Sequence, residues 1–166
     1  LQAHESLGRA LVPEHSYRLL LADLEDIHHQ KLAQAFEKKI FVGKADLKEP
    51  DIAKWKMHLP SPQSKEPLWI QFPDMLDYNS LNSRLMITDQ QNNPIPGTIR
   101  IEHEETQWKF EPIAPWKNGA YTLHVNSRLE DPAGNNLNGL FDHQIGQLKH
   151  KKEGEIESIT FKIGED

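Results

Sequence analysis

Residues 115–141, PWKNGAYTLHVNSRLEDPAGNNLNGLF, contain the signals that decide the fold. Apolar and polar side chains alternate over residues 121–125, which is typical of a β-strand with one buried face. A turn is expected to follow at Asp131, because a short Asp side chain can accept hydrogen bonds from backbone N–H groups two residues further on. Gly134 or Asn135 can take the left-handed conformation that such a turn requires. The stretch therefore predicts a strand followed by a tight turn.

Residues 11–43, LVPEHSYRLLLADLEDIHHQKLAQAFEKKIFVG, repeat the same order of signals. In both stretches a Tyr opens an alternating run, Leu-Glu-Asp follows, and a Leu stands six residues after the Asp. Self-similarity of this kind is typical of a repeated structural unit. The matching landmarks are Tyr17 with Tyr121, Asp26 with Asp131, Leu32 with Leu137, and Phe36 with Phe141.

The repeat decides between a helix and two strands in residues 20–39. Taken alone, Leu20, Leu24 and Ile27 have the spacing of an amphipathic helix. The counterpart of this segment contains Pro132 and several turn residues, which the interior of a helix does not tolerate. We therefore predict strand, turn and strand in both copies. Because His-Gln replaces Gly-Asn in the first copy, we expect its turn to differ or to be looser.

Residues 52–166 contain further short alternating runs that are separated by turn residues, at the spacing expected for a β-sandwich. Seven or eight strands are expected, and an antiparallel sandwich is the natural architecture for them. The runs with inward-facing apolar residues are 55–59, 68–72, 85–87, 99–101, 108–110, 121–125 and 159–163.

The segment before the first strand of each repeat is typical of a tyrosine corner. In such a corner the Tyr hydroxyl bonds to the backbone a few residues upstream and holds the crossover between two strands. Residues 115–121, PWKNGAY, predict this arrangement for Tyr121. Residues 11–17, LVPEHSY, predict it again for Tyr17.

At these residues the chain resembles the bacterial immunoglobulin-like domains of surface-layer and other envelope proteins. Their pattern G-x-x-Y-x-L-x-V … D-x-x-G-N-x-L is similar to residues 119–137, although Gly119 stands one residue nearer the Tyr. Residues 67–77, PLWIQFPDMLD, are similar to the family's early strand and its F-x-x-P-M-D turn, with Met75 and Leu76 departing from the usual order. The resemblance implies an all-β chain with an antiparallel immunoglobulin-like β-sandwich, preceded by the C-terminal strands of a second similar module.

The resemblance and the repeat together predict the domain organisation. Residues 1–43 form the incomplete C-terminal part of a first module, 44–51 a linker, and 52–166 a complete second module. The resemblance implies an extracytoplasmic bacterial protein, periplasmic, surface-bound or secreted, with a spacer, adhesion or assembly role. It carries over no catalytic residues, so we expect a structural or interaction protein that is not an enzyme. Its expected partner is a protein or glycan of the cell envelope.

Composition narrows the classes of function. The net charge of −6 comes from charges of both signs along the chain, whereas a nucleic-acid-binding protein needs a basic face. The sequence has no Cys, which excludes disulfides and thiol catalysis. No apolar run approaches the roughly 20 residues that cross a bilayer. We expect neither nucleic-acid binding nor a membrane-spanning segment.

The sequence offers candidate groups for metal binding and carboxylate chemistry, and each has a simpler role. The nine His residues include no His-x-x-x-His pair, so ready-made zinc spacing is absent. Turn oxygens could chelate calcium, but they lack the ordering of a recognised calcium loop, and turn stabilisation is favoured. Paired carboxylates near 102–105 could suggest glycoside hydrolysis, although a solvated hairpin tip explains them better. We expect no cofactor and no metal. The candidate calcium ligands are Asp131, Asn135, Asn136 and Asp142.

Trp69 is the one candidate contact residue for a ligand or partner. It alternates with Leu68 and Ile70, so its side chain should face away from the core. An outward Trp can stack on a sugar or anchor a protein contact. The alternative function is therefore a carbohydrate-binding accessory module that uses Trp69, which needs this side chain exposed beside another aromatic ring.

Residues 1–43 hold closing strands of a module whose opening strands do not appear in this sequence. A few strands cannot bury both faces, and unpaired edges invite association. We expect these strands to be completed by another polypeptide, by a second copy or by the second module, which makes self-association possible. Ordinary domain size suggests about 50 or more residues before Leu1 in a longer parent protein. The expected interface residues are Leu19, Leu21, Phe36, Ile40 and Val42.

Overall fold

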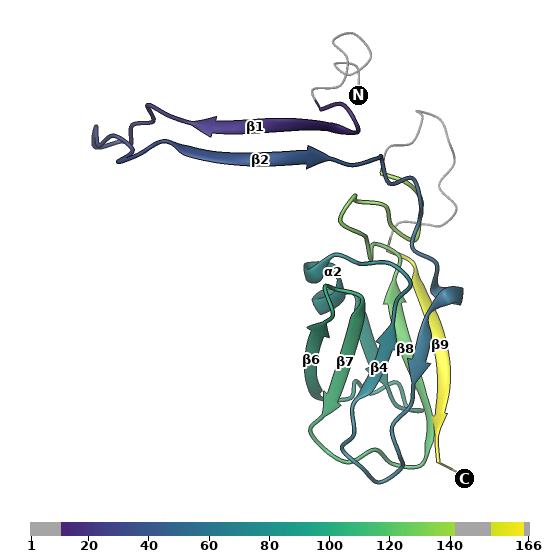
Figure 1. Ribbon diagram of the computed structural model, residues 1–166. Coiled ribbons are helices and arrows are strands. Elements are labelled where there is room, and N and C mark those ends of the chain that lie inside the picture. Colours follow the sequence, from purple (N-terminus) through teal and green to yellow (C-terminus); the bar gives the residue numbers. More distant parts are fainter. Residues whose placement is uncertain (1–10, 142–153, 165–166) are drawn as a thin grey trace. The chain divides into compact units, whose positions relative to one another are not determined.

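The computed structural model describes residues 11–141 and 154–164. The chain divides into two compact units, Leu1–Asp46 and Leu47–Asp166, and each is described by itself (Figure 1). The division falls within the segment 44–51, where the sequence predicted a linker.

The first unit contains a two-stranded antiparallel hairpin. Its strands are β1 (His15–Leu21) and β2 (Phe36–Val42), and their register runs from His15 opposite Val42 to Leu21 opposite Phe36. Residues 20–39 therefore form the end of one strand, a turn and the start of the next. The choice of strands over a helix is confirmed.

Alternation gives the hairpin two different faces, because successive side chains of a strand point to opposite sides. The more polar face carries Arg18 and Glu37, whose charged groups lie 3.7 Å apart, and it also exposes Leu20 and Phe41. No described residue of this unit is fully buried. The opposite face is apolar except for His15 and Lys38. Its apolar residues are Tyr17, Leu19, Leu21, Phe36, Ile40 and Val42.

The second unit is an antiparallel β-sandwich, as predicted, and its described residues form seven strands. One sheet has the order β3-β4-β7-β6, and the other has the order β5-β8-β9. If the seven strands are lettered A to G in chain order, these orders are A-B-E-D and C-F-G, the strand order of constant-type immunoglobulin domains. The strands are β3 (Lys56–His58), β4 (Leu68–Gln71), β5 (Leu85–Thr88), β6 (Gly97–Glu102), β7 (Gln107–Pro112), β8 (Gly119–Asn126) and β9 (Ile156–Ile163).

Side chains from both sheets form one buried cluster between the layers. Trp108 on β7 is fully buried, and its ring centroid lies 6.0 Å from that of Phe110. Trp116 is also buried, whereas Trp55 is partly buried and meets Phe72 edge to face. Large aromatic side chains bury the most apolar surface, so they account for much of the stability of this small core.

The second unit has two short helices, one before β3 and one between β4 and β5. The 3₁₀-helix η1 (Ile52–Lys54) begins after Asp51, whose side chain accepts the N–H of Ala53. Helix α2 (Tyr78–Ser83) begins after Asp77, whose side chain accepts the N–H of Ser80. Neither exceeds two turns, and the sequence analysis did not predict α2. Within the described part of the chain, no helix is long and apolar enough to cross a membrane.

Candidate functional site

Tyr121 holds the corner that leads into β8. Its hydroxyl accepts a hydrogen bond from the N–H of Lys117 and donates one to the carbonyl of the same residue, each at 3.0 Å. The ring of Trp116 stands perpendicular to that of Tyr121 at 5.2 Å. Tyr121 is 6% exposed, so its polar atom is bonded where little water reaches it. This is the hydrogen bond that the predicted tyrosine corner requires.

Tyr17 makes the equivalent bond in the first unit. Its hydroxyl accepts the N–H of Val12 at 2.7 Å, five residues upstream. The environment differs from that of Tyr121, because Tyr17 lies on the exposed hairpin and is only partly buried. The hydroxyl-to-backbone bond that a tyrosine corner requires is therefore present at both residues, once inside a packed sandwich and once outside it.

The turns at Asp131 and Asp26 have the same hydrogen-bond pattern. Oδ1 of Asp131 accepts N–H groups two and four residues ahead, at 2.8 and 2.9 Å. Oδ1 of Asp26 accepts the corresponding N–H groups, also at 2.8 and 2.9 Å. In each turn the Asp N–H bonds to the carbonyl four residues ahead, and the residue three ahead bonds back to the Asp carbonyl.

The left-handed position three residues after the Asp is also shared. Gly134 has φ +85°, and His29 occupies the equivalent position with φ +61°. The expectation that the first turn would differ or be looser is wrong at the level of the backbone. Gly costs less than His in this conformation, yet the hydrogen bonds of the Asp are the same with either residue. The carboxylate, rather than the glycine, defines this turn.

Asn135 adds two side-chain hydrogen bonds to the second turn. Its side-chain amide donates to Oδ2 of Asp131 at 2.9 Å, and its carbonyl oxygen accepts the N–H of Phe141 at 3.1 Å. Asn135 is 1% exposed. Gln30 stands at the equivalent place in the exposed hairpin. The role of Asp131 and Asn135 is therefore to hold the backbone, with their polar atoms used inside the turn.

A third copy of the same turn begins at Asp89, directly after β5. Its Oδ1 accepts the N–H groups of Gln91 and Asn93, each at 2.9 Å, and Asn92 takes the left-handed position with φ +61°. The N–H of Asn93 is the main cause that lowers the pKa of Asp89, because the bond favours the charged carboxylate. The sequence signal was Asp followed four residues later by Asn, as at Asp131.

Trp69 lies on the outer side of the first sheet, where alternation placed it. It is partly buried, and the ring of His58 on the neighbouring strand stacks parallel to it at 3.6 Å with an interplanar angle of 7°. Lys109 lies opposite Trp69 on the other side, and Arg100 follows on β6. A row of side chains thus crosses the four strands, with one face of the indole covered by imidazole.

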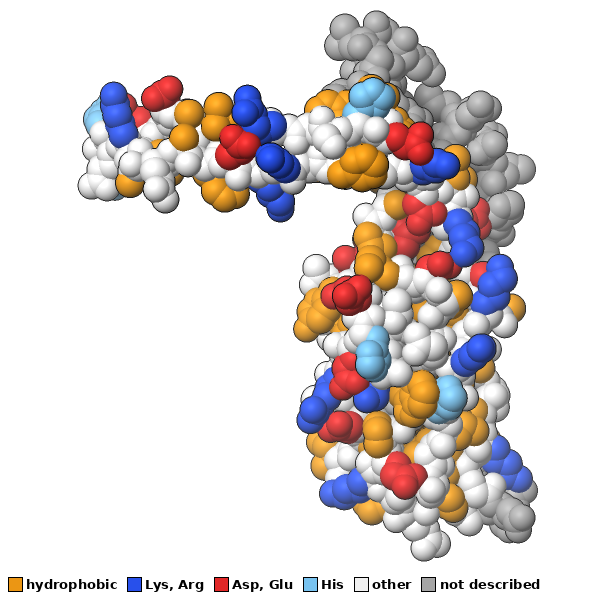
Figure 2. Space-filling view, viewed as in Figure 1, with side chains coloured by type: hydrophobic (Ala, Val, Ile, Leu, Met, Phe, Trp, Pro, Cys, Tyr) orange, Lys and Arg blue, Asp and Glu red, His pale blue; other side chains and the backbone are white. Residues whose placement is uncertain are grey.

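The cations of this row are neutralised by carboxylates. Lys109 Nζ lies 2.6 Å from Glu102, and Arg100 lies 3.3 Å from Glu111. The hydrogen bond from Lys109 is the largest cause that lowers the pKa of Glu102. On the face of the molecule shown in Figure 2, positive and negative side chains are interspersed. The row therefore contains a stacked aromatic pair, and it has no excess of charge that would attract an anion.

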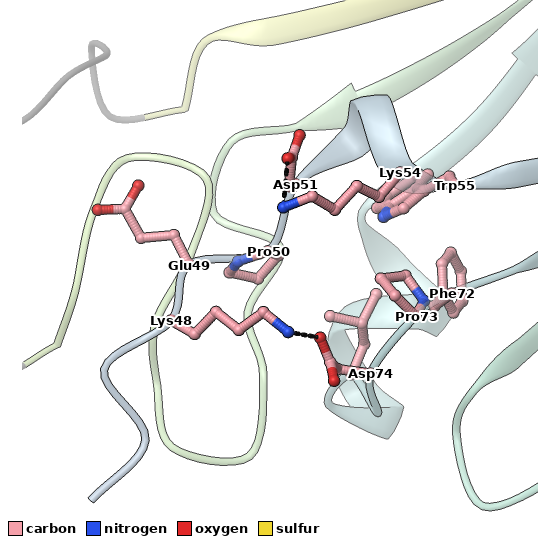
Figure 3. Close-up of a pocket in the computed structure, with 10 residues that line it drawn as sticks. Lys48, Glu49, Pro50, Asp51, Lys54, Trp55, Phe72, Pro73 and Asp74 are labelled. Atoms are coloured by element: carbon pink, nitrogen blue, oxygen red, sulfur yellow. Dashed lines mark hydrogen bonds and ion pairs between the residues drawn. The ribbon is translucent and has the colours of Figure 1, made fainter.

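A small pocket lies beside the segment that leads into β3 (Figure 3). Lys48 pairs with Asp74 and Lys54 pairs with Asp51, so its charges are neutralised across short distances. Its interior of about 20 Å³ holds roughly one water molecule. The pocket is too small for an organic ligand.

The described residues contain no group of three or more His, Asp or Glu side chains placed to hold a metal ion. Of the candidate calcium ligands, Asp131 and Asn135 bond to one another and to backbone N–H groups. Asp142 lies outside the described residues. The turn function of Asp131 and Asn135 accounts for their side chains.

Comparison with known proteins found no match between this chain and a protein-family model, a curated protein or a solved structure. The resemblance to bacterial immunoglobulin-like domains thus stays an expectation from the sequence, and the function is proposed from that expectation together with the geometry.

Proposed function

We propose that this chain is a non-catalytic structural or interaction part of a bacterial cell-envelope or secreted protein, built from immunoglobulin-like modules. The strand orders A-B-E-D and C-F-G support the module type. The corner at Tyr121, whose hydroxyl bonds to the backbone of Lys117, supports it independently.

The observation that carries the proposal is the repetition of one device in two compact units. Each unit has a tyrosine corner, a strand, an Asp turn and a returning antiparallel strand, in the same order. Modules of one type repeated along a chain give length and surface, which spacers and adhesins need. Enzymes instead need one constellation of reactive groups on a scaffold.

Cell fractionation tests the location that the proposal requires. An antibody against the chain should detect the natural protein in the envelope fraction or the culture medium of its source bacterium, and surface labelling should reach it on intact cells if it is exposed. Detection in the cytosol alone would contradict the proposal. A cytosolic protein of known abundance serves as the control for leakage.

One observation favours carbohydrate binding as a second candidate. Trp69 and His58 form two parallel rings on the outer side of the sheet, and Trp69 is not fully buried. The face of the indole that His58 does not cover is apolar, and a sugar ring can stack on such a surface. Glycan partners at the envelope are consistent with this candidate.

Affinity electrophoresis in soluble envelope polysaccharides tests the second candidate. Wild-type protein should be retarded, and Trp69→Ala should migrate as it does in a gel without polysaccharide. Met86→Ala is the matched control, because Met86 is 48% exposed on the other sheet. Equal retardation of Trp69→Ala and wild type would exclude Trp69 as the contact.

A further inference from the structure

We propose that the apolar face of the hairpin β1–β2 is covered by the other strands of a first β-sandwich, supplied by polypeptide that precedes β1. The edge of β1 away from β2 would pair with a strand equivalent to β5, and the apolar face would pack on a sheet equivalent to β3-β4-β7-β6. This inference rests on the modular function proposed above and names the partner of its first unit.

The hairpin presents apolar side chains to solvent on the face that sandwiches bury. Leu19 is 44% exposed and Phe36 is 51% exposed, although both lie on the face that also carries Tyr17. The opposite face also exposes Leu20 and Phe41, but each cross-strand pair on it contains a polar or charged residue, as in the pairing of Leu20 with Glu37. Figure 2 shows hydrophobic side chains exposed along this hairpin. An isolated two-stranded hairpin is marginally stable at best, so this face requires a covering layer.

The second unit shows what covers an equivalent hairpin. β8 and β9 pair so that Tyr121 lies opposite Phe161, as Tyr17 lies opposite Ile40 in the first unit. Leu123, the counterpart of Leu19, is fully buried. It lies in the cluster to which β4 and β7 of the facing sheet also contribute. Corresponding residues such as Leu123 and Leu19 are therefore buried in the second unit and exposed in the first.

The edge of the hairpin supports the same inference as its apolar face. In the second unit, β8 has two neighbours, β9 on one side and β5 on the other, and Leu123 lies opposite Ile87 of β5. Among the described residues, β1 has only β2 as a neighbour. The position of a β5 equivalent is therefore open along β1.

Chain order fixes where the covering strands come from. In the second unit, β3 to β7 all precede the corner at Tyr121, and β8 and β9 follow it. Because β1 follows the corner at Tyr17, it corresponds to β8, and the strands equivalent to β3–β7 belong before that corner. A second copy fits the face less well. The face carries Lys38 but no carboxylate, so a second copy packed face to face would add another positive charge and no partner for either.

Amide hydrogen exchange on the intact natural protein, with every residue that its gene encodes, tests the proposal against the 166-residue chain. We expect the amides of β1 to exchange at least about 100-fold more slowly in the intact protein, because strands inside a sandwich open far less often than an isolated hairpin. In the intact protein, Leu19→Lys should abolish this protection. Leu20→Lys is the matched control, since Leu20 lies one residue away on the polar face and is 54% exposed.

Three outcomes would overturn the proposal. The first is equal exchange of β1 in the intact protein and in the 166-residue chain. The second is a dimer of the 166-residue chain in sedimentation that Leu19→Lys dissociates, which would identify a second copy as the cover. The third is protection already present in the monomeric 166-residue chain and lost in Leu19→Lys, which would identify the second unit. Because exchange does not depend on cell location, its result is separable from the fractionation test.

Discussion

The hairpin β1–β2 and the pair β8–β9 have the same local design and different surroundings. Each begins at a Tyr whose hydroxyl bonds to the backbone, and each continues into an Asp turn with the same four hydrogen bonds. In the sandwich, Leu123 is fully buried, whereas Leu19 of the hairpin is 44% exposed. Turn chemistry therefore fixes the conformation and register of both pairs. Burial, which only one pair has, supplies most of the stability that can be measured.

The largest expected contrast is between Leu123→Ala and Leu19→Ala. Leu123→Ala should lower the free energy of unfolding of the sandwich by about 2–5 kcal/mol, because it removes buried methyl groups and leaves a cavity. Leu19→Ala in the 166-residue chain should change it by less than about 0.5 kcal/mol. Tryptophan fluorescence during denaturant unfolding measures this, since all four Trp residues belong to the second unit. Similar shifts for both variants would break the comparison.

A smaller contrast is expected for the two Asp turns. Asp131→Ala leaves N–H groups of the turn without an acceptor, including that of the buried Asn135, and should cost about 2 kcal/mol. Asp26→Ala should leave the fluorescence transition unchanged. Asp131→Asn, which keeps an oxygen at the same place, is the matched control and should recover part of the loss. If Asp131→Ala had no effect on the midpoint, the turn would not depend on its carboxylate.

The loss of unfolding free energy expected for the tyrosine variant of the sandwich is about half that of the Asp variant. Tyr121→Phe removes the acceptor of the Lys117 N–H and should lower the free energy of unfolding by about 1 kcal/mol. Tyr17→Phe should leave the sandwich transition where it is. Fluorescence-detected denaturation of both variants measures the difference. A midpoint for Tyr121→Phe equal to that of wild type would mean that the ring packs without a contribution from its hydroxyl.

The smallest expected effect is on the stability of the sandwich at acidic pH. Glu102 bonds to Lys109, and this bond holds the pKa of Glu102 below its ordinary value of 4.5. A carboxylate whose pKa is lowered by folding stabilises the folded state above its unfolded pKa, and this contribution is lost as the pH falls through the folded pKa. We expect the unfolding midpoint to fall with pH below about 4.5 and to fall less steeply in Glu102→Gln. Parallel pH profiles would show that the bond is too solvated to matter.

The sequence predicted features that depend on neighbouring residues. Alternation located the strands, and the repeat excluded a helix over residues 20–39. The outward position of Trp69 followed from its place beside Leu68. The short helix α2 was missed because six residues give no periodicity, although Asp77 before Ser80 was a capping signal. The likeness of the turn at Asp89 to the other two was missed, because Ile-Thr-Asp stands there in place of Leu-Glu-Asp.

Features that join distant segments could not be predicted. The stacking of His58 on Trp69 depends on the register of β3 against β4, and a shift of one residue would separate the two rings. The order of strands in the two sheets depends on pairings such as β5 with β8. Local sequence patterns do not predict such pairings. The exposure of Leu19 depends on what covers the hairpin, which lies beyond its own residues.

The three Asp turns also bear on the order of folding events. Each links an Asp to residues two to four positions ahead, so it forms without closing a long loop, and hairpins form in about 1–10 µs. The pairing of β4 with β7 joins residues about 40 positions apart, and loop-closure entropy opposes it. Contacts of that kind set the folding rate of sandwiches. Because the turns are then already formed when the two sheets meet, variants of Asp89 or Asp131 should change the folding rate more than the unfolding rate.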